Sequence, residues 1–137
     1  MSQIQKINQT NIAYQLDDAI IRIENLRLRT LIGFNPEEQI KPQDVVINAT
    51  ISFDATQAAK TDDENHTLDY KVISKQFIHH VENGRFRLLE KLNADLVDIV
   101  MANPQVLKTT ITVDKPHALR FADSVSVTLT ANRLSKR

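Results

Sequence analysis

Cysteine is absent from the 137 residues of this sequence, and glycine occurs only at positions 33 and 84. Without cysteine the chain cannot form disulfide bonds, use a thiolate nucleophile or bind zinc or iron–sulfur clusters through cysteine. With so few glycines it cannot form the phosphate-binding loops G-x-G-x-x-G or G-x-x-x-x-G-K. A reducing cytoplasm is the location that we expect for such a chain.

Net charge and long apolar runs are absent as well. The 17 basic residues balance the 17 acidic residues, and aromatic residues make up only 5% of the chain. Nucleic-acid and anionic-membrane binders are normally basic, and single strands are bound on exposed rings, so we expect neither partner. No apolar run approaches the roughly 20 residues of a membrane-spanning helix, and the first residues lack the apolar core of a signal peptide.

The remaining composition is that of one globular domain, because 42% of the residues are hydrophobic and 25% are charged. Residues 1–18 are polar and aperiodic, which predicts a tail or a loosely docked arm. A regular pattern begins at Ala19, so we expect a single domain over residues 19–137.

Four segments alternate apolar and polar residues, the pattern of strands with one buried face. They cover residues 19–30, 45–53, 109–113 and 125–131. In the first segment the apolar phase slips by one residue at Asn25, which predicts a β-bulge. The connection over residues 33–42 is too short for a helical crossover, so the first two strands should be antiparallel neighbours.

Two segments between the second and third strands have helical spacing. The first carries Val72, Ile73, Phe77 and Val81 and follows Asp69, which we expect to cap the helix. The second runs from about residue 86 to 102. For residues 55–69, which precede the first helix, we expect a short turn and a charged loop. The order predicts an α+β fold, ββααββ, with a four-stranded antiparallel sheet and two helices on one face. Its two open edges, unprotected by Pro or Lys, favour oligomerisation through the sheet.

Signals for metal or nucleophilic chemistry are weak. The four histidines show no H-x-H, H-x-x-x-H or H-E-x-x-H spacing, and no G-x-S-x-G occurs. We therefore expect no metal site. Glu38, Tyr70, Glu90 and Lys115 stand at loop, helix-start and strand-end positions, but each has an ordinary structural explanation, and their spacing alone does not bring them together.

Longer stretches carry a family resemblance. The runs IRIENLRLRTLIGFNPEE, QDVVINATI, LDYKVISKQFIHHVENGRFRLLEKL and VDKPHALRFADSVSVTLTANR resemble the dihydroneopterin aldolase family of the tunnelling fold. They lie between Ala19 and Arg133 without an obvious gap. LRLRT, HVEN and DKPHALRFADSVS are most similar to the family's branch of bacterial dihydroneopterin triphosphate 2′-epimerases.

The resemblance implies roles for named residues. Glu90, buried beside Leu88 and Leu89, would accept hydrogen bonds from the pterin 2-amino group and N3–H. Lys115 would move the proton of the 2′-hydroxyl, and Glu38 would orient that lysine. Tyr70, supplied by a neighbouring subunit, would act in proton transfer and substrate binding. The candidate cations for a triphosphate are Arg120 and His117 first, followed by Lys41, Arg27 and Arg29.

The reaction that the resemblance implies is retro-aldol cleavage and re-addition by acid–base chemistry, with no metal, Schiff base or cofactor. It would convert 7,8-dihydroneopterin triphosphate to its 2′-epimer, 7,8-dihydromonapterin triphosphate. One alternative is a dihydroneopterin aldolase of folate biosynthesis, which releases 6-hydroxymethyl-7,8-dihydropterin and glycolaldehyde. A non-catalytic pterin-binding module is another. The resemblance also implies rings of four subunits paired into octamers, with pockets between subunits.

Overall fold

Two long strands open the fold, and their alternating side chains explain how they pair. The computed structural model describes residues 12–135, so the expected tail lies outside the described residues over positions 1–11. β1 (Ala19–Ile32) pairs antiparallel with β2 (Gln43–Phe53), as predicted. The register shifts between Ile23 and Leu26, where Asn25 has a φ of 54° and its backbone N–H donates to Asn48 Oδ1 at 2.9 Å. The predicted bulge is confirmed.

The sheet has one strand more than the sequence predicts. β4 (Val106–Pro116) and β5 (Ser124–Asn132) continue it antiparallel beyond β2. A two-residue strand, β3 (Arg85–Phe86), lies parallel to the end of β1, and the order is β3-β1-β2-β4-β5. The prediction of four wholly antiparallel strands is therefore wrong. The sequence does not reveal β3, because two residues are too few to show an alternation of apolar and polar side chains.

The two predicted helices are present, with one boundary corrected. α3 (Tyr70–Glu82) begins after Asp69, whose side chain accepts hydrogen bonds from the backbone N–H groups of Lys71 and Val72. α4 (Leu89–Met101) begins later than predicted because residues 85–86 form β3. The segment expected to be turn and loop also contains α2 (Thr56–Thr61) and a 3₁₀ turn, η1 (Glu64–His66).

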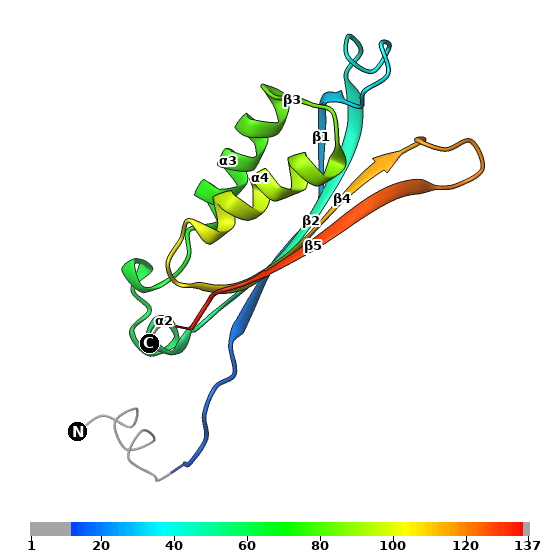
Figure 1. The fold of residues 1–137 in the computed structure, drawn as a ribbon. Coiled ribbons are helices and arrows are strands. Elements are labelled where there is room, and N and C mark those ends of the chain that lie inside the picture. Colours follow the sequence, from blue (N-terminus) through cyan, green and yellow to red (C-terminus); the bar gives the residue numbers. More distant parts are fainter. Residues whose placement is uncertain (1–11, 136–137) are drawn as a thin grey trace.

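The helices cover one face of the sheet (Figure 1). The apolar stripes of α3 and α4 pack on inward-facing strand residues to form one core, and burial of this apolar surface is the main stabilising term. Its largest fully buried members include Phe77, Ile32, Ile47, Ile51, Ile73, Leu92, Leu96 and Ile111. The opposite face is polar and carries hydroxyl pairs such as Thr112–Thr128, whose oxygens lie 2.7 Å apart.

Both edges of the sheet, as far as the structure describes it, have unpaired backbone N–H and C=O groups. Among the described residues, β5 has no strand beyond it, and the outer side of β1 is paired only at Leu31 and Ile32. The hairpin that joins β4 to β5 projects from the body, and residues 12–18 lead away from the start of β1 (Figure 1). Within residues 12–135, no helix combines the length and apolar character needed to cross a membrane.

Candidate active site

An ion pair joins two of the four residues singled out in the sequence. Glu38 lies in the loop between β1 and β2, and Lys115 lies near the end of β4. Lys115 Nζ donates to Glu38 Oε2. The side chains are only 12% and 21% exposed for Lys115 and Glu38, respectively. Partial burial strengthens such a pair relative to one in open solvent, so this carboxylate holds the lysine in a defined place.

Three further features hold the Glu38 carboxylate. The backbone N–H of Asn35 donates to Oε1 at 3.3 Å, and Gln43 Nε2 donates to Oε2 at 3.4 Å. Gln43 Nε2 also donates to the carbonyl of Ile32 at 2.9 Å, which ties it to the end of β1. Gly33 has a φ of 128°, and a Cβ atom at this position would overlap the carboxylate. Glycine is therefore required there for conformation and for space.

Sequence reasoning missed Gln43 and Gly33 as parts of this site. Gln43 has no signal in a single sequence, because its role depends on the fold of the β1–β2 connection. Gly33 did offer a signal, since it is one of two glycines in the chain and directly follows a strand. Such a glycine indicates a special backbone conformation or a close approach.

The charge state of the pair follows from these contacts. The hydrogen bond from Lys115 lowers the pKa of Glu38 below its ordinary value, and the contacts from Gln43 and Asn35 act in the same direction. Burial opposes them but does not outweigh them. Glu38 is therefore a carboxylate at neutral pH.

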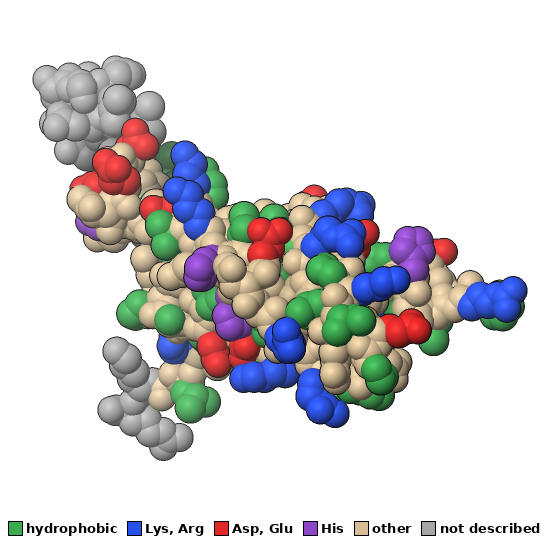
Figure 2. Space-filling model, turned by 90° about the horizontal axis from the view of Figure 1, so that it is seen from above, with side chains coloured by type: hydrophobic (Ala, Val, Ile, Leu, Met, Phe, Trp, Pro, Cys, Tyr) green, Lys and Arg blue, Asp and Glu red, His purple; other side chains and the backbone are tan. Residues whose placement is uncertain are grey.

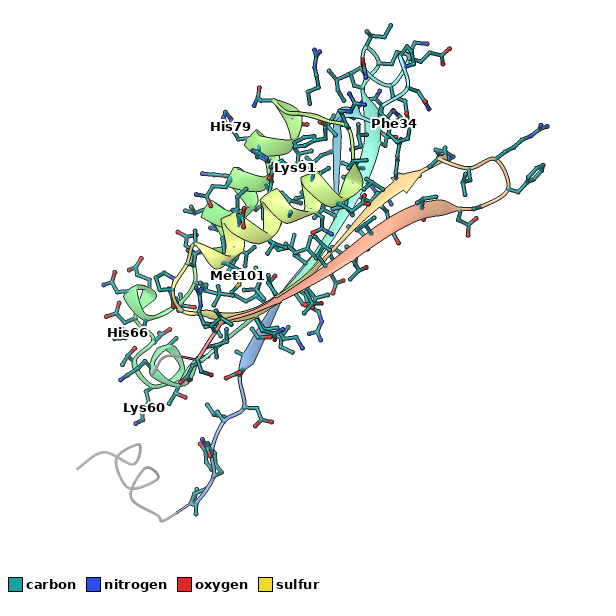
Figure 3. All side chains as sticks on the ribbon, viewed as in Figure 1. Phe34, Lys60, His66, His79, Lys91 and Met101 are labelled. Carbon is teal, nitrogen blue, oxygen red and sulfur yellow. The ribbon has the colours of Figure 1, made fainter. Side chains whose placement is uncertain are left out.

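A hollow of about 220 Å³ opens beside Glu38. Its lining comes from the end of β1, the loop that follows it, and the segment around β3. The lining residues are Leu31, Gly33, Glu38, Gln39, Arg85, Phe86 and Arg87. In Figure 3, the labelled residue Phe34 lies at this end of the sheet, and the labelled residue Met101 lies at the far end of α4. The hollow is about the volume of a small heterocycle, and its wall leads into the first turn of α4.

Glu90 and Leu89 lie in that first turn of α4. Leu89 is half-buried, whereas Glu90 and the preceding Leu88 are exposed. The expected burial of Glu90 beside leucines is therefore wrong within a single chain. The cause is that α4 begins at Leu89, which leaves Glu90 at the rim of the helix layer.

Tyr70 lies elsewhere in the molecule. It is the first residue of α3, is 54% exposed, and lines a hollow with Arg22 and Ile23 of β1. From Ile23 to Ile32, beside the Glu38 site, the strand spans about 30 Å at roughly 3.3 Å per residue. Within one chain, Tyr70 therefore cannot reach Lys115 and Glu38.

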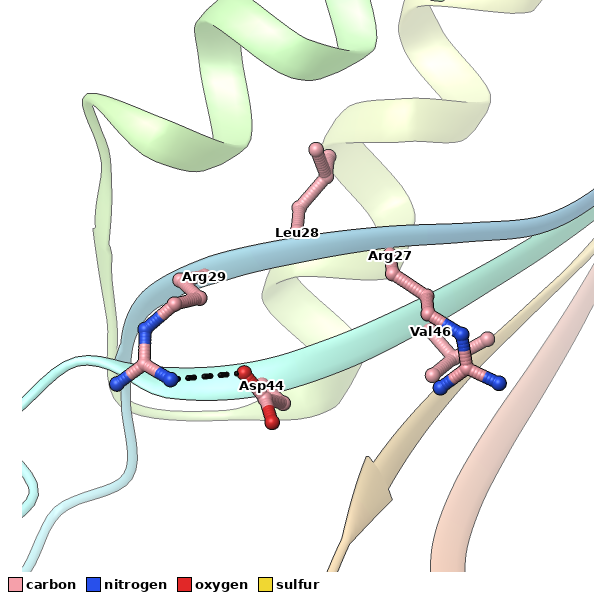
Figure 4. Close-up of a pocket in the computed structure, with 5 residues that line it drawn as sticks. All are labelled: Arg27, Leu28, Arg29, Asp44 and Val46. Atoms are coloured by element: carbon pink, nitrogen blue, oxygen red, sulfur yellow. Dashed lines mark hydrogen bonds and ion pairs between the residues drawn. The ribbon is translucent and has the colours of Figure 1, made fainter.

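Among the candidate cations for a triphosphate, Arg29 already has partners within the chain. It forms an ion pair with Asp44 at 3.0 Å and donates a hydrogen bond to the Pro42 carbonyl at 2.9 Å. Figure 4 shows this pair with Arg27 and Val46 on the face of the sheet opposite the helices, while Leu28 points toward the helices. Arg29 is therefore less suited to bind phosphate than the sequence suggested.

The other exposed candidate cations lie in two connecting segments. His117 and Arg120 are exposed on the projecting β4–β5 hairpin, and the Arg120 guanidinium stacks over the Phe121 ring, 5.3 Å from its centroid. Lys41 is exposed in the β1–β2 loop. Figure 2 shows several Lys and Arg side chains on the half of the molecule that carries the hairpin. This end of the molecule can attract an anion.

The part of the chain that the structure describes brings together no group of three or more His, Asp or Glu side chains able to hold a metal ion.

Comparison with known proteins shows the family to which the chain is similar. The model of the family described as FolB, dihydroneopterin aldolase, matches residues 21–130. A dihydroneopterin triphosphate 2′-epimerase of Pseudomonas aeruginosa is 50% identical over 115 residues, which are 84% of this chain and 94% of that protein. A dihydroneopterin aldolase of Escherichia coli is 32% identical over 108 residues, 79% of this chain and 88% of that protein. The crystal structure of E. coli dihydroneopterin aldolase in complex with neopterin superposes with a TM-score of 0.79 at 31% identity, covering 83% of this chain and 99% of that one.

Proposed function

The chain belongs to the dihydroneopterin aldolase family, and from this premise we propose that it is a dihydroneopterin triphosphate 2′-epimerase. The observation that carries the proposal is the difference in identity between the two kinds of relative. The chain is 50% identical to the epimerase and 32% identical to the aldolase, over nearly the same length. The substrate is then 7,8-dihydroneopterin triphosphate, and the product is 7,8-dihydromonapterin triphosphate.

Lys115 is the acid–base residue of the proposed reaction, with Glu38 as the residue that orients it. The ion pair supports this assignment, because it holds the lysine beside Glu38, which lines the hollow. Lys115 takes the proton of the 2′-hydroxyl, directly or through a water molecule. The C1′–C2′ bond breaks, and its electrons pass into the C6=N5 imine of the dihydropterin. The substrate is its own electron sink, so neither a Schiff base nor a metal is required.

The fate of the released aldehyde decides the product. When the aldehyde stays bound, turns and re-adds through its other face, C1′ is joined again and the 2′ centre is inverted. When it leaves and C1′ is protonated, the ring product is 6-hydroxymethyl-7,8-dihydropterin. An epimerase must therefore hold the aldehyde and its triphosphate longer than it takes to rotate. His117 and Arg120 are the cations that we assign to this task, since they are exposed on the hairpin that follows Lys115.

Glu90 and Leu89 form the pterin-binding side of the pocket. A carboxylate at Glu90 accepts hydrogen bonds from the 2-amino group and N3–H of the ring, and Leu89 contacts the ring. The exposure of Glu90 in one chain supports a pocket that a second subunit completes. The position of Tyr70 supports the same arrangement, because it lies too far from Glu38 along β1 to act in the same chain. We propose an octamer of two four-membered rings, with Tyr70 entering from a neighbouring subunit.

Product analysis by chromatography tests the function. The purified protein is incubated with 7,8-dihydroneopterin triphosphate or with 7,8-dihydroneopterin, each with EDTA. We expect fast conversion of the triphosphate to its 2′-epimer and little 6-hydroxymethyl-7,8-dihydropterin. Replacing Lys115 with alanine should remove most of the turnover, whereas Lys108→Ala on the same strand should leave it unchanged. Loss of activity on addition of EDTA would contradict the metal-free mechanism.

An aldolase of folate biosynthesis is the second candidate, favoured by the family model and by the E. coli aldolase among the relatives. Fast cleavage of unphosphorylated 7,8-dihydroneopterin would establish it. If neither substrate changes while a pterin still binds, the chain is a binding module, and the acid–base roles of Lys115, Glu38 and Tyr70 are wrong.

A further inference from the structure

A second hollow, separate from the one beside Glu38, lies at the start of α3. It has a volume of about 460 Å³, and its lining comes from β1 and α3: Arg22, Ile23, Tyr70, Lys71, Ser74 and Lys75. The four helical residues form two pairs spaced four apart, so their side chains lie in adjacent rows on one side of α3. None of these residues lines the hollow beside Glu38. Of this set, only Tyr70 has a role in the proposed reaction.

The polar lining of this hollow consists of groups that can donate a hydrogen bond. Arg22, Lys71 and Lys75 are positively charged, and Tyr70 and Ser74 carry hydroxyl groups. No carboxylate is among the described residues that line it. The whole chain has 17 basic and 17 acidic residues, so three cations without an acid are a local concentration of positive charge. Such a surface attracts anions.

The charges of the three cations are not neutralised within the part of the chain that the structure describes. Arg22, Lys71 and Lys75 are exposed, and none of them forms an ion pair there. Asp69, the acidic residue just before α3, uses its carboxylate to accept from two backbone N–H groups of the first helical turn. The three cations are therefore better placed to bind a phosphate group than Arg29, which has an ion-pair partner.

The charge of the proposed substrate shows which anion such a site would take. A triphosphate ester carries about −3.5 to −4 at neutral pH, because its terminal phosphate contributes about −1.5 to −2 and each inner phosphate about −1. His117 and Arg120 together supply at most two positive charges. Further cations are needed to balance the triphosphate.

Tyr70 connects this hollow to the substrate. This step rests on the proposed function, in which Tyr70 enters the pocket from a neighbouring subunit. Because Arg22, Lys71 and Lys75 line the same hollow as Tyr70, they come to the pocket with it. We propose that these three cations bind the triphosphate of the substrate and so select phosphorylated over unphosphorylated pterins.

Steady-state kinetics with two substrates test this selection. In the double variant Lys71→Ala, Lys75→Ala, the KM for 7,8-dihydroneopterin triphosphate should rise at least about tenfold, because two charge-assisted contacts to phosphate are lost. The KM for 7,8-dihydroneopterin, which has no phosphate, should change less than about twofold. The variant Lys71→Arg, Lys75→Arg keeps both charges and should retain most of the affinity for the triphosphate. An equal change for both substrates, or no change for either, would overturn the proposal.

Isothermal titration calorimetry with inorganic triphosphate tests the same site without catalysis. The control variant Lys60→Ala, Lys108→Ala removes two lysines from α2 and β4 and should bind like wild type, whereas Lys71→Ala, Lys75→Ala should bind at least about tenfold more weakly. Suppose that wild type epimerises the pterin triphosphate, but its binding of inorganic triphosphate is absent or does not depend on the two α3 lysines. The anion site is then wrong and the epimerase stands. If wild type converts neither pterin but binds triphosphate through these lysines, the epimerase is wrong and the anion site stands.

Discussion

At the scale of single residues, the site depends on how Glu38 is held. Three donors, Lys115, Gln43 and the Asn35 backbone, converge on one carboxylate, and Gly33 leaves the space that it fills. A carboxylate fixed in this way keeps a negative charge beside the lysine. The ion pair therefore holds the lysine at a defined place, as the acid–base role proposed for it requires.

Removing the lysine should be visible in the titration of its partner. In Lys115→Met the largest cause of the lowered Glu38 pKa is gone, so we expect that pKa to rise toward the ordinary value for glutamate. Carbon-13 NMR of selectively labelled glutamate carboxyl groups measures it. Lys108→Met, on the same strand, should leave the Glu38 titration where it is in wild type. An unchanged Glu38 pKa in Lys115→Met would mean that the ion pair does not form in solution.

At the scale of elements, a polar cluster joins the two helices behind the site. His80 of α3 lies 2.8 Å from Asp95 of α4, and Lys91 donates to the same carboxylate at 2.9 Å. The His80 ring packs against Phe86 of β3, with 5.5 Å between centroids. Phe86 also lines the hollow beside Glu38. The cluster, whose Lys91 is labelled in Figure 3, therefore contacts one of the residues that line the hollow.

Asp95 should contribute stability in a pH-dependent way. Burial alone would raise the pKa of Asp95, but hydrogen bonds from Lys91 and His80 outweigh it and lower the pKa below the ordinary value of 3.8. The ionised form is thus favoured in the folded state, so its contribution is present above that value and is lost as pH falls through the folded-state pKa. We expect Asp95→Asn to reduce the free energy of unfolding by about 1–2 kcal/mol at pH 7.

Urea denaturation at several pH values checks this expectation. The loss in Asp95→Asn should shrink toward pH 3, because wild-type Asp95 is then increasingly protonated. Asp98→Asn lies one turn further along the same helix at an exposed position and should have little effect at any pH. A loss in Asp95→Asn that is independent of pH would assign its effect to packing and not to charge.

At the scale of the whole molecule, the pocket is proposed to need two chains, which co-expression can test. Tyr70→Phe and Lys115→Ala should each inactivate a uniform assembly. Mixed assemblies, isolated through two different affinity tags, should regain part of the activity, because some pockets combine an intact Tyr70 from one chain with an intact Lys115 from another. Glu38→Gln mixed with Lys115→Ala should regain none, since both residues belong to the same half of the pocket. No recovery in the first mixture would place Tyr70 outside the pocket.

The sequence by itself determined the features that repeat along the chain. Alternation located the long strands, the phase slip at Asn25 located the bulge, and Asp69 marked the start of α3, because these signals arise from neighbouring residues. The family resemblance, carried by runs spread over most of the chain, is confirmed by the family match over residues 21–130.

Only the tertiary structure decided what depends on distant residues. β3 has two residues and exists because they meet the end of β1, and its formation delays the start of α4. Lys115 meets Glu38 across 77 positions of sequence, and Gln43 joins them through the fold of one loop. The distance between Tyr70 and that pair along β1 is likewise set by the sheet. Local propensity carries no record of such contacts, because their free energy is gained only when the whole sheet and its helices pack together.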